Sequence, residues 1–273
     1  MDKRFDNKVV VVTGAGGIIC SAIAKDFAEK GAKVALLDLN YDSAKMYEDE
    51  MTKEGLIAKA YKCNVLDNNS VIKVNEEIKK DFGKVDILIN GAGGNSPKAT
   101  TDQEIYDKNL KGSSFFELDP QGISFVFDLN ILGTIIPTQI IAKDMESGSC
   151  IINISSMNSY TPLTKIVAYS GAKAAVNNFT KWIAVHLSKQ GIRCNAIAPG
   201  FLVTNQNKNL LFNQDGTPTA RTEKILRNTP MNRFGNTKEM LGAITFLADN
   251  EMSGFVTGVI IPVDGGFSAY SGV

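Results

Sequence analysis

Residues 9–17 read VVVVTGAGG, four uncharged β-branched residues that pass directly into a glycine-rich turn. A run of this kind is typical of a strand covered on both faces of a sheet. Apolar residues then recur at helical spacing over residues 18–27, Gly31 ends the expected helix, and a second expected strand over residues 33–37 leads to Asp38. The stretch therefore predicts a strand–helix–strand unit with a glycine turn between its first strand and its helix.

The glycine turn and the acid at the end of the second strand predict a dinucleotide site. Such a turn lets the backbone approach a pyrophosphate, and the N-terminus of the following helix favours its negative charge. The carboxylate of Asp38 can accept hydrogen bonds from the 2′ and 3′ hydroxyls of a ribose and repels a 2′-phosphate, which favours NAD over NADP. A plain βα turn with glycines for tightness is the less favoured alternative. The turn residues expected to border the cofactor are Gly14, Gly16, Gly17 and Ile19.

Strand and helix patterns alternate along the rest of the chain. Further strands are expected at residues 58–62, 86–90, 149–154, 192–198 and 259–263, and helices at residues 42–54, 69–81, 124–146, 169–190 and 237–249. This alternation predicts an α/β fold, a single doubly wound (Rossmann) domain over residues 1–273 with a mostly parallel seven-stranded sheet and helices on both faces. Ligands of such sheets bind beyond the carboxyl ends of the strands, where the strand order reverses.

Two long segments, residues 94–123 and 201–236, interrupt the alternation. Long irregular segments in a compact domain are often functional lids, although either could be an ordinary surface excursion. Both follow the carboxyl end of a strand, so both are expected to border the same opening of the ligand site. We expect the second to be a substrate lid because it follows Pro199-Gly200. For the first, a role in subunit contacts is about equally favoured.

The composition excludes several classes of partner. The 29 basic and 29 acidic residues balance, so neither nucleic acid nor an anionic membrane surface is expected as a partner. Apolar runs stop short of the ~20 residues of a membrane span, and residues 1–6 lack the apolar region of a signal peptide. Cysteines without metal-ligand spacing read as reduced core thiols of a cytoplasmic protein, and with only one histidine, His186, no metal is expected; the cysteines are Cys20, Cys63, Cys150 and Cys194.

Three residues in the second half of the chain predict acid–base chemistry on an alcohol. Tyr169 and Lys173 are four residues apart in an expected helix, so their side chains share one face, and Ser156 lies 13 residues before the tyrosine. A phenol has an ordinary pKa of about 10, and a neighbouring ammonium is expected to lower it. The tyrosine could then serve as a general base toward a secondary alcohol held by the serine. Tyr-x-x-x-Lys alone is common by chance, so its weight depends on its surroundings.

Taken in order, these motifs resemble the short-chain dehydrogenase/reductase family over essentially the whole chain. The resemblance implies that Ser156 orients the substrate oxygen and that Tyr169 exchanges its proton. It implies that Asn130 holds a water beside Lys173, and that Lys173 also bonds the nicotinamide ribose. A homotetramer, built through the helices that carry Asn130 and Tyr169, is implied as well. Further cofactor contacts implied by the resemblance are Asn64, Val65, Asn90, Gly91, Ala92, Pro199, Gly200, Leu202 and Thr204.

The chain departs from the family's usual first turn, Thr-Gly-x-x-x-Gly-x-Gly. Ile18 and Cys20 stand at the second and third glycine places, while Gly16 and Gly17 come just before them. A β-branched residue makes a close approach of backbone to pyrophosphate harder. We expect the turn to adjust, with Gly17 making the close approach. Asn64, where the family usually has aspartate, is a conservative departure.

Four motifs are similar to a narrower group within the family, namely TGAGGIIC, NGAGGNSPK, SSMN and the final DGGFSAYSGV. That group interconverts D-mannonate and D-fructuronate with NAD(H) in hexuronate breakdown. A sugar acid carries a carboxylate that a basic side chain should meet, and Asn158 could bond a substrate hydroxyl. The candidates for the carboxylate, each of which could instead be a solvated surface charge, are Lys98, Lys165, Arg221 and Arg227.

Two alternatives remain open at the level of the sequence. One is another short-chain polyol or aldonate dehydrogenase, for example a gluconate-type enzyme. The other is an NAD-binding regulator that kept the fold and lost turnover. A regulator of this kind is expected to lack one of the four catalytic residues, and this chain has all of them, so the second alternative is less favoured.

Overall fold

The computed structural model describes residues 3–203 and 208–272, and these residues form one seven-stranded sheet in the order β3-β2-β1-β4-β5-β6-β7. Every pair of neighbouring strands is parallel. The predicted doubly wound α/β fold is therefore confirmed, and the sheet is parallel throughout. The strands are β1 (Val9–Thr13), β2 (Lys33–Asp38), β3 (Ile57–Lys62), β4 (Ile87–Asn90), β5 (Cys150–Ile154), β6 (Arg193–Pro199) and β7 (Ile260–Val263).

The strand order reverses between β1 and β4, which lie side by side at the centre of the sheet. The chain leaves β1 toward β2 and β3 on one side, and continues from β4 toward β7 on the other. Ligands of doubly wound sheets bind in the crevice outside the carboxyl edge of the sheet, at such a reversal. The glycine turn after Thr13 and the turn after Asn90 both lie at this edge.

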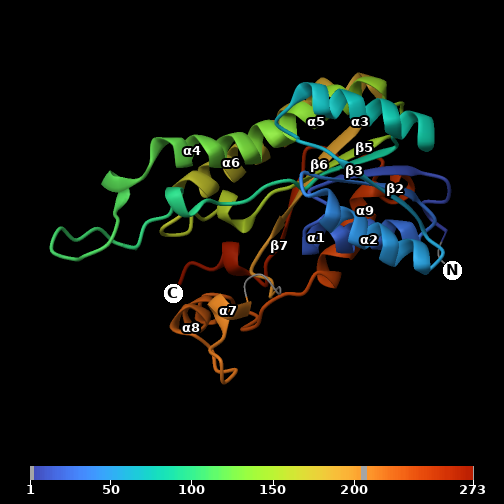
Figure 1. Ribbon diagram of the computed structural model, residues 1–273. Coiled ribbons are helices and arrows are strands. Elements are labelled where there is room, and N and C mark those ends of the chain that lie inside the picture. Colours follow the sequence, from blue (N-terminus) through green and yellow to red (C-terminus); the bar gives the residue numbers. More distant parts are fainter. Residues whose placement is uncertain (1–2, 204–207, 273) are drawn as a thin grey trace.

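Helices cover both faces of the sheet (Figure 1). On one face, α1 (Ile18–Glu29), α2 (Tyr41–Lys53) and α9 (Lys238–Ala248) pack in one apolar cluster with alternate residues of the central strands. On the other, α3 (Asn68–Asp81), α5 (Gly133–Ile141) and α6 (Val167–His186) form a second cluster. Strands buried on both faces read as continuous apolar runs, which explains the four consecutive valines of β1.

The helix that carries Asn130 is longer at its start than the sequence pattern predicted. It runs as α4 (Pro120–Phe127), a π-helical turn (Asp128–Leu132), α5 and a 3₁₀ turn (Ala142–Asp144), so it begins at Pro120 instead of residue 124. The reason is a strong start signal, because Asp119 caps Gln121 N and proline suits the first helical position. By length and composition alone the run Pro120–Asp144 could span a membrane, with a mean hydropathy of 1.5, and 39% of that window is buried. Its α5 part packs against α3 and β4, and its α4 part packs against α6.

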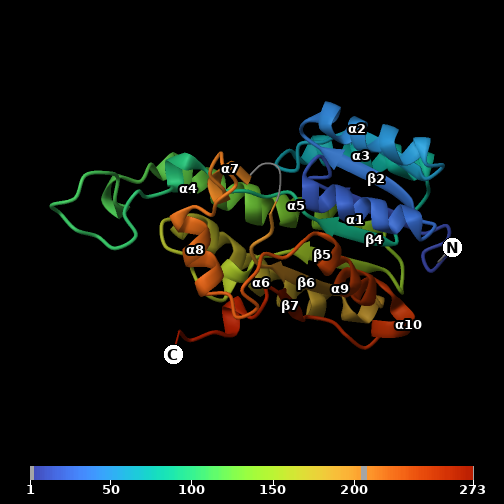
Figure 2. The ribbon, with the colours of Figure 1, turned by 90° about the horizontal axis from the view of Figure 1, so that it is seen from below.

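The two long excursions lie at the same end of the molecule (Figures 1 and 2). The first forms an arm that projects from the body, and its base is closed because Ser113 N donates to Asp102 Oδ2 at 2.8 Å. The second contains α7 (Lys208–Leu211) and α8 (Ala220–Arg227). An ion pair between Lys224 and Glu104 joins the two. The remaining short helices are α10 (Asn250–Ser253) and 3₁₀ turns at Pro97–Ala99, Phe115–Glu117, Met157–Ser159, Ser188–Gln190 and Phe267–Ala269.

Candidate active site

The glycine turn after β1 is locked to the turn after β4. The Thr13 hydroxyl accepts hydrogen bonds from Gly91 N at 3.0 Å and Ala92 N at 3.2 Å. Gly14 has a φ of 68°, and a Cβ built there would lie 2.9 Å from Ala92 Cα. Only glycine combines that backbone conformation with this close approach. The two turns therefore form one rigid rim of the crevice.

Asp38 sits at the glycine turn, as a ribose-binding carboxylate would require. One carboxylate oxygen accepts from Gly16 N at 2.9 Å and the other from Asn40 N at 2.8 Å. Each oxygen keeps a second lone pair that can accept from a hydroxyl. A Cβ on Gly16 would lie 2.8 Å from Ser43 Cβ, so glycine is needed to bring the turn against Asp38.

A hollow beside Asp38 has room for a flat base. Leu39, 65% exposed, lines it together with Lys62 and Asn64, and its volume is about 310 Å³. The Asn64 side chain accepts from Leu66 N at 3.1 Å, which leaves its amide hydrogens as the donors available to a ligand. Sequence reasoning missed Leu39, although an apolar residue directly after a strand-ending acid was a usable signal.

The structure explains how the turn tolerates Cys20 at a glycine place. The Cys20 side chain is buried, and its Sγ occupies the space beside Gly91, where a Cβ would lie only 2.2 Å away. Burial raises the pKa of the Cys20 thiol to about 12, so it stays protonated and packs as an apolar group. Gly17 is the residue before α1, with the Gly14 carbonyl oxygen 3.3 Å from a built Cβ. Its approach to a pyrophosphate stays a prediction.

Three of the predicted cofactor contacts turn their side chains into the core. Asn90 Nδ2 donates to Thr138 Oγ1 and to Asn153 Oδ1, both at 2.9 Å. Leu202 belongs to the core cluster beneath α9, and Val65 is 7% exposed. The Leu202 side chain also lines the hollow behind the segment that follows β6, whereas at Asn90 and Val65 core packing leaves the backbone to border the crevice. Pro199 is buried, Gly200 packs on Asp264, Ile19 is partly buried in α1, and Thr204 lies outside the described residues.

Lys173 reaches from α6 to the carboxyl end of β5. Its Nζ donates to the Ile154 carbonyl at 2.8 Å and lies 5.7 Å from the centre of the Tyr169 ring. Because burial disfavours the charged form, the pKa of Lys173 falls to about 8. The predicted sharing of one helix face by Tyr169 and Lys173 is thus present in the structure.

The predicted lowering of the Tyr169 pKa is wrong for the protein by itself. Burial raises the pKa of Tyr169, and a hydrogen bond with Ser156 opposes that rise only in part. Removal of the phenol from water outweighs that hydrogen bond, and Lys173, whose Nζ lies 5.7 Å from the ring centre, does not reverse the shift. Tyr169 therefore carries its proton at neutral pH.

The Asn130 side chain fixes the backbone of Gly93 and Gly94, which passes between Asn130 and Lys173 in space. It lies in the π-helical turn, fully buried, and its amide accepts from Gly94 N at 3.2 Å while donating to Gly94 O at 2.7 Å. A Cβ built on Gly93 would lie 2.7 Å from Asn130 Oδ1 and 3.1 Å from Lys173 Nζ. Gly93 is thus in contact with both side chains, a placement that sequence reasoning missed. That Asn130 holds a water stays a prediction.

Ser156 follows β5 and faces the Tyr169 hydroxyl. Its own hydroxyl accepts from Asn158 N at 3.2 Å, which caps the 3₁₀ turn Met157–Ser159. Asn158 is 5% exposed, and its Oδ1 has no hydrogen-bond partner among the described residues. A buried acceptor without a partner is costly, which makes Asn158 a plausible position for a ligand hydroxyl.

The four basic candidates do not converge on one point. Lys165 and Arg221 lie near enough to Glu104 to lower its pKa further, after the larger effect of its hydrogen bond with Lys224. Lys98 lies instead 3.9 Å from Asp119. Arg227 is exposed near the end of α8. Lys165 adopts a φ of 74° and lines a hollow of about 300 Å³ with Thr101 and Glu104 from the arm.

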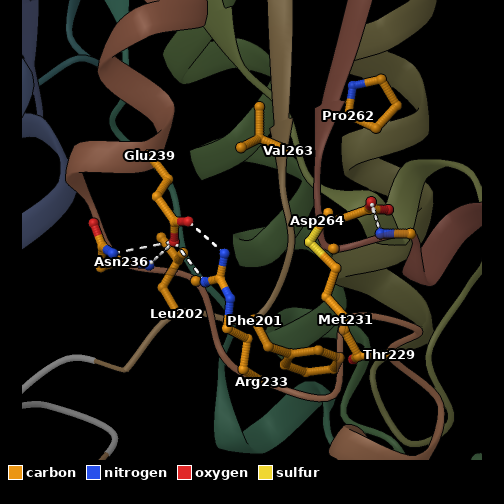
Figure 3. A pocket seen from close by; sticks show the side chains of 13 residues that line it. Phe201, Leu202, Thr229, Met231, Arg233, Asn236, Glu239, Pro262, Val263 and Asp264 are labelled. Carbon is orange, nitrogen blue, oxygen red and sulfur yellow. Dashed lines mark hydrogen bonds and ion pairs between the residues drawn. The ribbon is translucent and has the colours of Figure 1, made fainter.

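A third hollow, of about 360 Å³, lies behind the segment that follows β6 (Figure 3). Phe201 and Leu202 form one wall, and Asp264 lies on the other side. Arg233 and Glu239 lie on the same side of it as Leu202 and form an ion pair at 2.6 Å, which lowers the pKa of Glu239 to about 2. The residues that line it do not include the tyrosine, serine and lysine described above, so we assign it no chemistry.

Comparison with known proteins places the chain in a family. The sequence pattern described as enoyl-(acyl carrier protein) reductase matches residues 14–268. An uncharacterized oxidoreductase of Haemophilus influenzae is 60% identical over 274 residues, covering 99% of this chain and 96% of that protein. This chain belongs to the short-chain dehydrogenase/reductase family. The resemblance drawn from the motifs is therefore confirmed, as is the prediction of an oxidoreductase.

Two further members of the family are similar over their whole length. An uncharacterized oxidoreductase of Bacillus subtilis, UxuB, is 49% identical over 275 residues and covers 100% of this chain and 99% of that protein. A crystal structure from Haemophilus influenza, described as a proposed D-mannonate oxidoreductase with bound NAD, has a TM-score of 0.96 at 59% identity. It covers 98% of this chain and 97% of that chain.

Proposed function

We propose that this protein transfers hydride between NAD(H) and a secondary alcohol or ketone of a sugar acid, with D-mannonate and D-fructuronate as the favoured pair. The observation that carries the proposal is the meeting of Ser156, Tyr169 and Lys173 at the carboxyl edge of the sheet, on the same side as Asp38. The NAD bound in the similar Haemophilus structure supports the choice of cofactor.

The residues of the crevice fit a dinucleotide. Tightly packed glycines bring backbone to the rim, α1 begins there, and Asp38 has free lone pairs for ribose hydroxyls. Bound NAD supplies a nicotinamide that accepts or donates hydride. The protein's own residues then supply orientation and proton transfer.

Proton transfer is assigned to Tyr169. Ser156 holds the substrate oxygen, and its hydrogen bond with Tyr169 lowers the cost of forming a phenolate. In the reductive direction, Tyr169 gives its proton to the carbonyl oxygen. In the oxidative direction Tyr169 takes the proton of the substrate hydroxyl. Lys173, whose Nζ lies 5.7 Å from the centre of the Tyr169 ring, favours the phenolate whenever the lysine is charged.

The sugar-acid class is supported by two features near the opening of the ligand site. Cations at Lys165 and Arg221 border the arm, where a carboxylate could compete with Glu104 for them. The unpartnered Oδ1 of Asn158 could accept from a substrate hydroxyl. Arg221 lies on the segment 201–236, which the sequence predicted to border the site.

A substrate panel tests the proposal. The purified protein is mixed with NAD and D-mannonate, D-gluconate or a simple polyol, and absorbance at the NADH band is followed. We expect turnover with D-mannonate to exceed that with the other substrates by at least ~10-fold in kcat/KM, because charge and hydroxyl contacts must both be satisfied. Preference for gluconate would favour the other aldonate dehydrogenases. An absence of any absorbance change would favour a regulator without turnover.

The choice of NAD over NADP depends on Asp38. In the Asp38→Ala variant the ribose loses its acceptor and the 2′-phosphate loses a repelling charge. We expect NAD binding to weaken roughly 10-fold and the discrimination against NADP to shrink by more than that. Binding is measured by fluorescence titration with NADH and NADPH. Asp42→Ala, on the exposed first turn of α2, is the matched control. An unchanged preference in Asp38→Ala would contradict the assignment.

A homotetramer in the cytoplasm completes the proposal. The helix Pro120–Asp144 is apolar along its length but only partly buried, with Phe125 and Leu132 exposed. Trp182 and Val185 are exposed on α6, at 57% and 76%. Apolar residues left open on these two helices are what association through them would cover. Light scattering at micromolar concentration measures the assembly.

A further inference from the structure

A closed set of hydrogen bonds links the serine loop after β5 to the helix that carries Tyr169. The Ser155 hydroxyl donates to Asn177 Oδ1 at 2.5 Å, and Asn177 Nδ2 donates to Ser159 Oγ at 2.7 Å. The Ser159 hydroxyl in turn donates to the Ser156 carbonyl oxygen at 2.6 Å. Each hydroxyl gives its single proton once, so the directions of all three bonds are mutually consistent.

These hydrogen bonds join the serine loop after β5 to α6, and the reaction requires a fixed position of one relative to the other. Asn177 is two turns beyond Tyr169 and one turn beyond Lys173, on the same helix face. Ser155 and Ser156 are buried at the end of β5, and Ser155 N is held by the Ile197 carbonyl at 2.8 Å. The amide of Asn177 therefore holds the chain on both sides of Ser156. It bonds to Ser155, which precedes Ser156, and to Ser159, which follows it.

We infer that Asn177 is a positioning residue, which acts through Ser155 and Ser159 to hold Ser156 at the distance from Tyr169 that proton transfer requires. An amide is suited to this task because it offers one acceptor and two donors in a fixed plane. A carboxylate would lack the donor to Ser159, and an apolar residue would lack both. The inference rests on the proposed function for the proton transfer at Tyr169 and for the identity of the substrate.

The neighbouring residue offers a matched control. Asn178 is the next residue of α6 and is exposed, whereas Asn177 is half-buried against the loop. Asn178→Ala makes the same chemical change in the same helix without touching the serine loop. Ser159→Thr keeps the hydroxyl that donates to Ser156, while Ser159→Ala removes it.

Steady-state kinetics on the full-length variants test the inference. We expect Asn177→Ala and Ser159→Ala to lower kcat about 10- to 30-fold, with the dissociation constant of NADH within twofold of the parent protein, because misplacement affects reaction more than binding. Ser159→Thr should recover most of the rate, and Asn178→Ala should match the parent. The double variant, Asn177→Ala with Ser159→Ala, should have a kcat little lower than either single variant, since each change removes the same hydrogen-bond link to Ser156.

The pH profile separates positioning from a general loss of packing. Tyr169 is faced by Ser156 and by Lys173, and the Ser156 hydrogen bond lowers its pKa. When Ser156 moves away, the hydrogen bond that lowers the pKa of Tyr169 is lost, so the rising limb of the oxidation rate should shift to higher pH in Ser159→Ala. Loss of stability alone would not move this limb.

Crystal structures of Ser159→Ala and Asn177→Ala provide a readout that does not depend on the substrate. We expect the Ser156 hydroxyl to be displaced or to adopt more than one position, while Tyr169 and Lys173 stay in place. An undisplaced Ser156 together with kcat within twofold of the parent would overturn the inference. If the parent protein turns over no sugar acid, the proposed function fails, and the position of Ser156 in these structures still decides the inference.

Discussion

Replacing Tyr169 by phenylalanine is expected to lower kcat about a thousandfold, within the range that loss of a general acid–base group produces. The change removes one oxygen and keeps the ring, so packing around residue 169 is retained. Without the phenol, the substrate oxygen must exchange its proton with water in a site where burial makes that exchange slow. Initial rates with the best substrate of the panel, in both directions, measure the effect.

The binding of NADH should survive this substitution almost unchanged, because the glycine turn and Asp38 hold the dinucleotide away from residue 169. Tyr61→Phe is the matched control. Its hydroxyl donates to Asp81 at 2.6 Å beside the edge strand β3, so that variant should lose about 1 kcal/mol of stability and keep its turnover. A Tyr169→Phe protein with more than a tenth of the parent kcat would show that another group transfers the proton.

The direction of the Tyr169 pKa shift also fixes the sign of the pH dependence. Burial raises this pKa, so the phenol is protonated at neutral pH and ready to donate in the reductive reaction. Oxidation needs the phenolate, and its rate should therefore rise with pH. The residual rate of Tyr169→Phe should lack this rise. These signs follow from the direction of the shift alone.

The fold could be predicted from the sequence because each strand and helix carries its own signal. Valines in β1, the glycines after Thr13 and the acid that ends β2 specify a strand–helix–strand unit through local chemistry. Parallel pairing of all seven strands then follows from alternation. The start of the long helix at Pro120 was also readable, since aspartate followed by proline is a start signal that the apolar periodicity alone did not reveal.

Sequence spacing could not predict how one residue of the site makes room for another that is distant in the chain. Cys20 at a glycine place suggests a clash until Gly91, 71 positions later in the chain, is seen to vacate the space that Sγ fills. The pKa of Tyr169 depends in the same way on how deeply two helices bury it, which no local pattern contains. Asn90 and Leu202 show the same limit, because their side chains turn toward a core assembled from distant segments.

Gly93→Ala is expected to lower kcat about a hundredfold, the second-largest effect, because it displaces at once two side chains to which we assign a part in the reaction. The added Cβ would lie 2.7 Å from Asn130 Oδ1, and that oxygen cannot retreat, since it is fully buried and bonded to Gly94 N. The same Cβ would lie 3.1 Å from Lys173 Nζ, which would be pushed from the Ile154 carbonyl. Initial rates together with a thermal melting curve separate this displacement from unfolding.

Gly94→Ala is the matched control for Gly93→Ala. A Cβ on Gly94 would have as its neighbour only a Leu129 methyl at 3.9 Å, an ordinary contact, so Gly94→Ala should keep kcat within about twofold. Both variants alter the unfolded chain equally, and a difference between them therefore reports on the native site. If Gly93→Ala instead retained a third or more of the parent kcat, the packing of Asn130 and Lys173 around Gly93 would not be what sets the rate. Proton transfer would then have to tolerate movement of Asn130 and Lys173, contrary to the close fit seen here.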